Sequence, residues 1–243
     1  MYLTIIAEIG ELLLAIVGIY IALFVLIRLR PLWAEPFKRR RGYVLSVIVL
    51  VVLLGKVSED VIALESGHVD EVLLSWIHRL VPISLTGFFQ VLTLSASATA
   101  VFSFVGVADI VLVLMRQRIE ALTLTSTVLA AVLIVYLVKT AVGRTRPALW
   151  ETQWFWGSSF PSGHSLTSAA LATAACLCVA RLWPQLRWPV IALATVWVSL
   201  VALSRLVLGV HWPTDVLAAA FAGVLIALAI NAAVWRSCSA RKR

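Results

Sequence analysis

Charged residues are scarce in this sequence: Asp, Glu, Lys and Arg together make up 13% of its 243 residues, whereas 62% are hydrophobic. Soluble domains carry about 25% charged and about 45–50% apolar residues. The apolar residues here stand in long blocks, which a soluble fold of this size cannot bury. Because each block approaches the roughly 20 residues that cross a bilayer, the composition predicts an all-α, polytopic membrane helical bundle.

Cysteine and clustered metal ligands are also scarce. Two of the three cysteines stand in an apolar block and the third in a basic tail: Cys176, Cys178 and Cys238. This placement argues against a disulfide framework and against a cysteine metal site. Carboxylates do not cluster in a way that offers Mg²⁺ its oxygen ligands. The sequence therefore predicts a protein that uses neither a metal ion nor another cofactor.

The N-terminus lacks the positive region that opens a secretory signal peptide. Glu8 and Glu11 stand where basic residues belong, and the apolar block is too long for the core of a signal peptide. We therefore expect a retained first span at about residues 4–27. Six further apolar blocks follow, at about residues 43–64, 90–115, 119–139, 163–183, 188–207 and 214–235.

Two parts of this pattern are irregular. Lys56, Glu59 and Asp60 interrupt the block at 43–64, which makes it the weakest span. Residues 68–83 mix charged and apolar residues at helical spacing, as an interfacial helix does. The predicted organisation is an N-terminal helix with a basic loop, a membrane domain and a basic tail, over residues 1–42, 43–235 and 236–243.

The net charge of +8 indicates topology rather than nucleic-acid binding, because the basic residues stand in short loops between apolar blocks. With seven spans, most of these loops fall on one side, which the positive-inside rule makes cytoplasmic. The N-terminus is then outside. The remaining basic residues, on the outer side, call for an anionic ligand: Lys56, Arg79, Lys139, Arg144, Arg146 and Arg205.

Three short motifs follow one another on this outer side. They are Lys139-x6-Arg146-Pro147, Pro161-Ser162-Gly163-His164 and Ser204-Arg205-x5-His211-x3-Asp215. The first and third supply three cations, and hydrolysis of a phosphate ester requires fixed donors aimed at its developing negative charge. In the second, we expect Pro161 to open a helix. The free N–H groups of its first turn, around Ser162 and Gly163, would then form an anion site.

The two histidines of these motifs suit a covalent mechanism. Asp215 stands four residues after His211, so a helix that has begun there places both side chains on one face. The carboxylate can then fix the imidazole tautomer and stabilise its developing positive charge. His164, at the start of another span, is left to protonate the leaving oxygen.

Together the motifs resemble the signature of the type 2 phosphatidic acid phosphatase superfamily, K-x6-RP, PSGH and SR-x5-H-x3-D, with every signature position matched. The resemblance covers roughly residues 43–235. It implies a six-span helical core with a metal-free site, to which the first span is an addition. By position it implies that His211 forms a phosphohistidine, with Asp215 as its partner and His164 as the acid. The implied phosphate ligands are Lys139, Arg146, Ser162, Gly163 and Arg205.

The predicted function is therefore hydrolysis of a lipid phosphate at the extracytoplasmic face of the plasma membrane, with the lipid and the bilayer as partners. Undecaprenyl diphosphate, phosphatidylglycerophosphate, phosphatidic acid and lipid A phosphates all fit this prediction. A phosphotransferase, in which a hydroxyl group replaces water, stays open as an alternative. Seven spans argue against a soluble vanadate-dependent haloperoxidase, and the intact motifs argue against a non-catalytic lipid-binding or transport protein.

Several residues stay without a single interpretation. Asp109 lies inside a span, where an acid indicates either function or polar packing. Arg144 either adds to the field around the substrate or sits in solvent, and Asp70 is read as a helix cap. The aromatic residues Trp150, Trp154, Phe155 and Trp156 suit a membrane-interface belt or a lipid entrance.

Overall fold

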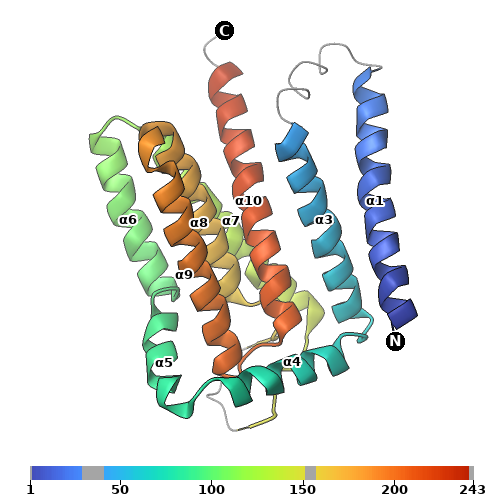
Figure 1. The fold of residues 1–243 in the computed structure, drawn as a ribbon. Helices are drawn as coiled ribbons and strands as arrows, with labels where there is room; N and C mark the ends of the chain where they lie inside the picture. The colour runs from blue at the N-terminus through green and yellow to red at the C-terminus, as the bar shows by residue number, and fades with distance from the viewer. Residues whose placement is uncertain (1, 29–40, 151–156, 241–243) are drawn as a thin grey trace. The chain divides into compact units, whose positions relative to one another are not determined.

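The computed structural model describes residues 2–28, 41–150 and 157–240, and every regular element in these ranges is a helix (Figure 1). The predicted all-α class is therefore confirmed. The chain forms two compact units, residues 1–59 and 60–243. The first unit contains α1 (Tyr2–Arg28) and most of α3 (Arg41–Ile62).

The core of the second unit consists of α7 (Arg118–Val142), α8 (Gly163–Leu182), α9 (Arg187–Val207) and α10 (Pro213–Ala240). Helix α8 packs against the other three. Small residues permit this close approach, as they do between membrane helices generally. A Cβ added to Gly223 of α10 would lie 2.4 Å from the carbonyl oxygen of Leu166 in α8.

The stretch predicted as an interfacial helix forms α4 (Gly67–Leu80), which lies across one end of the bundle and contacts α9 and α10 (Figure 1). Its place at a membrane interface stays a prediction. It is followed by η1 (Ile83–Leu85) and α5 (Thr86–Leu94), and the chain bends by 91° between α4 and this second segment. Leu74 and Asp70 form the buried part of α4.

The predicted continuous span at 90–115 is wrong. Helix α5 ends at Leu94, and α6 (Ala98–Leu114) begins after three intervening residues. Ser97 has an extended backbone and its side chain accepts a hydrogen bond from the N–H of Ala100 at 3.3 Å. This serine cap starts a new helix. The hydropathy of the stretch alone suggests a single continuous helix.

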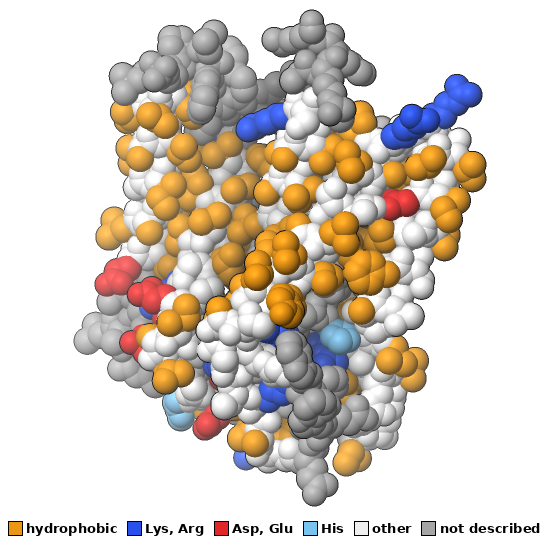
Figure 2. Space-filling model, turned by 180° about the vertical axis from the view of Figure 1, so that it is seen from behind, with side chains coloured by type: hydrophobic (Ala, Val, Ile, Leu, Met, Phe, Trp, Pro, Cys, Tyr) orange, Lys and Arg blue, Asp and Glu red, His pale blue; other side chains and the backbone are white. Residues whose placement is uncertain are grey.

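The chain is a multi-pass membrane protein. Among the described residues, five helices are long and apolar enough to cross a bilayer, or six if the bent pair 67–80 and 83–94 forms one span. Helix α3 covers the weak second block but is not among them, so the count of seven stays a prediction. Hydrophobic side chains cover the middle of the face shown in Figure 2.

Within the second unit, α7 and α9 end where α8 and α10 begin, so residues 143–150, 157–162 and 208–212 lie at one end of the bundle (Figure 1). The opposite end carries the loop cations Arg116, Arg118, Arg181 and Arg187. Asp109 of α6 accepts a hydrogen bond from Thr125 of α7. Its described contact is therefore polar packing between helices.

Candidate active site

The three motifs converge at the end of the bundle that α4 crosses. Lys139 lies in the last turn of α7, and the residue that caps this helix, Gly143, has a left-handed conformation (φ 65°). The following segment carries Arg146, and α8 starts with Gly163 and His164. Arg205 lies in the last turn of α9, and Asp215 in the first turn of α10. Four helices and one connecting segment thus bring together residues that are up to 76 positions apart, from Lys139 to Asp215.

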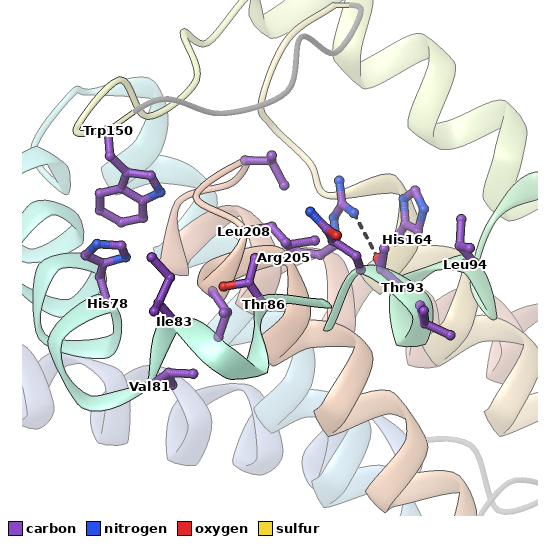
Figure 3. Close-up of a pocket in the computed structure, with 14 residues that line it drawn as sticks. His78, Val81, Ile83, Thr86, Thr93, Leu94, Trp150, His164, Arg205 and Leu208 are labelled. Carbon is purple, nitrogen blue, oxygen red and sulfur yellow. Dashed lines mark hydrogen bonds between the residues drawn. The ribbon is translucent and has the colours of Figure 1, made fainter. Parts of the chain in front are cut away.

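Three cations share this region. Lys139 Nζ and Arg146 Nη2 both donate to the carbonyl oxygen of Ser158, the latter at 3.5 Å. Arg205 is 1% exposed, and its Nη1 donates to Thr93 Oγ1 at 2.8 Å (Figure 3). Burial lowers the pKa of Arg146 from its ordinary value, and Asp215 opposes that effect. Clustered, partly buried positive charge of this kind is stabilised by an anion that enters it.

The start of α8 differs from the expectation in two respects. Pro161 does not open the helix, because Ser162 is the N-cap and Gly163 the first helical residue. The N–H of Ser162 is not free, because it donates to the backbone carbonyl of Asp215 at 3.3 Å. The Ser162 side chain accepts from the N–H of Ser165 at 3.5 Å. The first-turn N–H groups left without an intrahelical partner are therefore those of Gly163 and His164.

His211 and Asp215 lie together, although not for the predicted reason. Helix α10 begins at Pro213, so His211 precedes the helix instead of sharing a face of it. Asp215 Oδ2 reaches back to accept the N–H of Trp212 at 2.9 Å, as a residue at the third helical position does in a capping box. The same oxygen lies 3.5 Å from His211 Nδ1, at the long end of hydrogen-bonding distance.

The His211 ring is buried and held neutral. Burial lowers its pKa to about 4; Asp215 opposes this shift, whereas Arg205 and Lys139 add to it. Nδ1 faces the carboxylate, so we assign the ring proton to Nδ1. Nε2 lies 3.4 Å from Arg146 Nη1, which also donates to the Val210 carbonyl at 2.7 Å. A neutral imidazole nitrogen is thus directed toward the cation cluster.

His164 and Arg205 line a cavity of about 580 Å³ (Figure 3). Its wall combines polar side chains from α5 with an apolar set: Val81, Ile83, Val91, Leu94, Val207 and Leu208. Trp150 closes one side, where it stacks on His78 at 4.0 Å between ring centroids. Trp150 is thus a cavity wall, whereas the other three aromatic residues of the expected belt lie outside the described residues. The cavity suits an amphiphile.

Sequence reasoning missed the roles of Arg144 and Asp70. Arg144 does not sit in solvent: its side chain is 9% exposed and forms ion pairs with Asp70 and Asp215, each at 2.6 Å. Asp70 is fully buried. One signal was available, because Asp70 stands four residues before Leu74 and therefore on the apolar face of its helix. Among the described residues, no three His, Cys, Asp or Glu side chains group as metal ligands.

The described residues combine an all-helical membrane fold with a buried histidine and clustered cations. These are the features that the resemblance of the motifs predicts. The model of the PAP2 superfamily matches residues 120–238 of this chain. The resemblance drawn from the motifs is thereby confirmed.

Individual relatives match over shorter segments. Phosphatidylglycerophosphatase B of Escherichia coli K12 is 45% identical over 74 residues, which cover 30% of this chain and 28% of that protein. Lipid A 1-phosphatase of Rhizobium johnstonii is 34% identical over 122 residues, 46% of each chain. The chain thus matches less than half the length of these curated relatives.

Two solved structures share the fold. A PAP2-type phosphatidylglycerolphosphate phosphatase from Bacillus subtilis superposes with a TM-score of 0.72 at 20% identity, over 78% of this chain and 96% of that one. The LpxE structure from Aquifex aeolicus gives a TM-score of 0.54 at 22% identity, over 65% and 92%. At these identities the likeness shows the arrangement of helices.

The protonation state of His211 is directly measurable. With ¹⁵N-labelled histidine, the protein has four ring systems to resolve, and loss of one set in His211→Asn assigns His211. We expect this ring to stay neutral from pH 7 down to pH 5 without phosphate, because its lowered pKa of about 4 keeps the proton off. His68, exposed on α4, serves as the solvent-exposed comparison. A protonation midpoint for His211 near the usual value of about 6.5 would contradict this electrostatic description.

Proposed function

We propose that this protein is a metal-independent lipid phosphatase that acts through a phosphohistidine. The observation that carries the proposal is the buried His211 ring, with Asp215 beside Nδ1 and Arg146 Nη1 3.4 Å from Nε2. A ring in this setting is a nucleophile directed at the place where a phosphoryl group would be held by cations. The proposed domain for this reaction spans residues 43–235, with the first helix as an addition.

Binding of the phosphoryl group is assigned to the cations and to the start of α8. Lys139, Arg146 and Arg205 neutralise the non-bridging oxygens, and the two guanidinium groups match their geometry. The N–H groups at Gly163 and His164 add the positive end of a helix dipole. Ser162 supports this turn through its capping contact with Ser165. These donors act more strongly as negative charge develops on the oxygens.

In the first step, the Nε2 lone pair of His211 attacks phosphorus, and the bond from phosphorus to the leaving oxygen breaks. Asp215 stabilises the imidazolium that forms at His211. A protonated His164, favoured by the negative charge of the bound substrate, gives its proton to the leaving oxygen and releases a lipid alcohol from a monoester, or a lipid monophosphate from a diphosphate. In the second step, His164 takes a proton from water while that water attacks phosphorus. The N–P bond then breaks and inorganic phosphate leaves.

The substrate proposal follows from the cavity next to His164. The leaving group must lie on the side of the acid, and there the cavity offers apolar side chains with a few polar groups. A lipid whose hydroxylated head carries the phosphate fits such a lining. Relatives named for phosphatidylglycerophosphate and lipid A support this class of substrate.

The function is tested by phosphate release from phosphatidic acid, phosphatidylglycerophosphate, undecaprenyl diphosphate and lipid A in mixed micelles. We expect release from at least one lipid, undiminished by EDTA and inhibited by orthovanadate, which mimics five-coordinate phosphorus. His211→Ala should abolish release, because no nucleophile remains. Activity that EDTA removes and Mg²⁺ restores would refute the mechanism, and so would full activity in His211→Ala.

We further propose that the protein resides in the plasma membrane with the site on the extracytoplasmic side. Support comes from the loop cations at the end of the second unit opposite the site, since cytoplasmic loops carry the excess of Lys and Arg.

Single cysteines test this orientation in a variant whose three native cysteines are replaced by alanine. Gly67→Cys lies at the start of α4 on the side of the site, and Gln185→Cys is exposed in η2 (Pro184–Leu186) at the other end. An impermeant maleimide should label Gly67→Cys in intact cells, but Gln185→Cys only after permeabilisation. The reverse labelling pattern would place the site in the cytoplasm.

A further inference from the structure

A chain of buried charges leads away from His211 to helix α4. The Asp215 carboxylate has His211 Nδ1 3.5 Å from Oδ2, and its Oδ1 accepts from Arg144 Nη1 at 2.6 Å. The other terminal nitrogen of the same guanidinium, Nη2, donates to Asp70 Oδ2 at 2.6 Å. One arginine therefore bridges two carboxylates, of which both are fully buried.

Asp70 also holds the start of α10, where Asp215 resides. Its Oδ1 accepts the N–H of Thr214 at 3.0 Å, and its Oδ2 accepts the Thr214 hydroxyl at 2.7 Å. The same hydroxyl oxygen accepts from Arg144 Nη1 at 2.9 Å, and Ser66 Oγ accepts from Arg144 Nη2 at 2.9 Å. Arg144 is thus held on both sides, and its guanidinium has little freedom to turn.

This arrangement determines which way the Asp215 carboxylate faces. Charge-assisted hydrogen bonds at 2.6 Å are among the stronger ones, so Oδ1 stays with Arg144. The Trp212 N–H holds Oδ2 at 2.9 Å. With both oxygens held, Oδ2 remains the one beside His211.

We propose that Asp70 and Arg144 are positioning residues for the proposed reaction, and that they orient Asp215 toward His211 without touching the phosphate. The inference rests on the proposed phosphatase function and adds two residues that are not signature positions of its motifs: Asp70 lies outside all three, and Arg144 is one of the unspecified positions of the first. It also gives α4 a role, because this helix supplies the carboxylate at the far end of the chain of contacts.

The proposal predicts a specific kinetic pattern. Asp70→Asn and Arg144→Gln should lower kcat, because a misdirected Asp215 no longer orients His211, and a displacement near 1 Å costs about 10²-fold. KM and the inhibition constant of inorganic phosphate should stay within about twofold of wild type, since neither residue holds the phosphoryl group. The double variant should be no worse than the poorer single variant, because both changes break one network.

Matched controls are available on α4. Glu71→Gln removes the neighbouring carboxylate, which is exposed, and Arg79→Gln removes an exposed cation. Both should leave kcat at the wild-type value. Asp70→Glu keeps the charge and should recover part of the rate lost in Asp70→Asn. A raised KM with unchanged kcat in Arg144→Gln would make Arg144 a phosphate ligand and overturn the proposal, and wild-type kinetics in both variants would do the same.

A second readout separates this proposal from the phosphatase function. The ¹⁵N shifts of the His211 ring report how its proton is shared between Nδ1 and Nε2. Asp70→Asn should increase the share on Nε2, whereas Glu71→Gln should not. If the wild type releases no phosphate from any lipid, the proposed function fails, but this shift still decides whether Asp70 orients Asp215. An unchanged ratio in a folded Asp70→Asn variant would exclude the positioning role. Failure of Asp70→Asn to fold, with Asp70→Glu folded but unchanged in kcat and ring ratio, would mean a structural role only.

Discussion

The buried carboxylate of Asp215 connects the parts of the candidate site more than any other group does. Its two oxygens contact Arg144, the Trp212 N–H and the His211 ring. Its backbone carbonyl accepts the N–H of Ser162 and so ties α10 to the N-cap of α8. A fully buried carboxylate is costly unless it is paired and hydrogen-bonded. The groups that pair with the Asp215 carboxylate therefore stabilise its charge, and they also fix its position beside His211.

The site also holds an excess of positive charge, which the fold keeps in place. Lys139, Arg146 and Arg205 gather beside a histidine that burial keeps neutral. Repulsion among the cations destabilises the empty site, and an entering phosphate would relieve that repulsion. The same cations would stabilise the greater charge of a five-coordinate transition state. The interior thus holds its donors in place before the reaction begins, which is a general source of catalytic power.

The motifs allowed much of this site to be predicted from sequence, because hydropathy placed all three on one side of the membrane. The failures come from single hydrogen bonds that hydropathy does not register. Ser97 caps a helix within an apolar stretch, and the Ser162 N–H finds the carbonyl of Asp215. The contacts of Arg144 are the least predictable from sequence, because its partners Asp70 and Asp215 lie 74 and 71 positions away. No local pattern reports such a pairing.

The most direct test of the account is the identity of the residue that becomes phosphorylated. Rapid quench with a ³²P-labelled lipid substrate should trap an acid-labile, alkali-stable phosphoenzyme in the wild type, and peptide mapping should place it on His211. His164→Ala should still form it, with slower formation and slower breakdown, because protonation of the leaving group typically contributes about 10²–10⁴-fold. His211→Ala should form none. A normal yield of phosphoenzyme in His211→Ala, with none in His164→Ala, would reverse the roles of the two histidines and contradict the account.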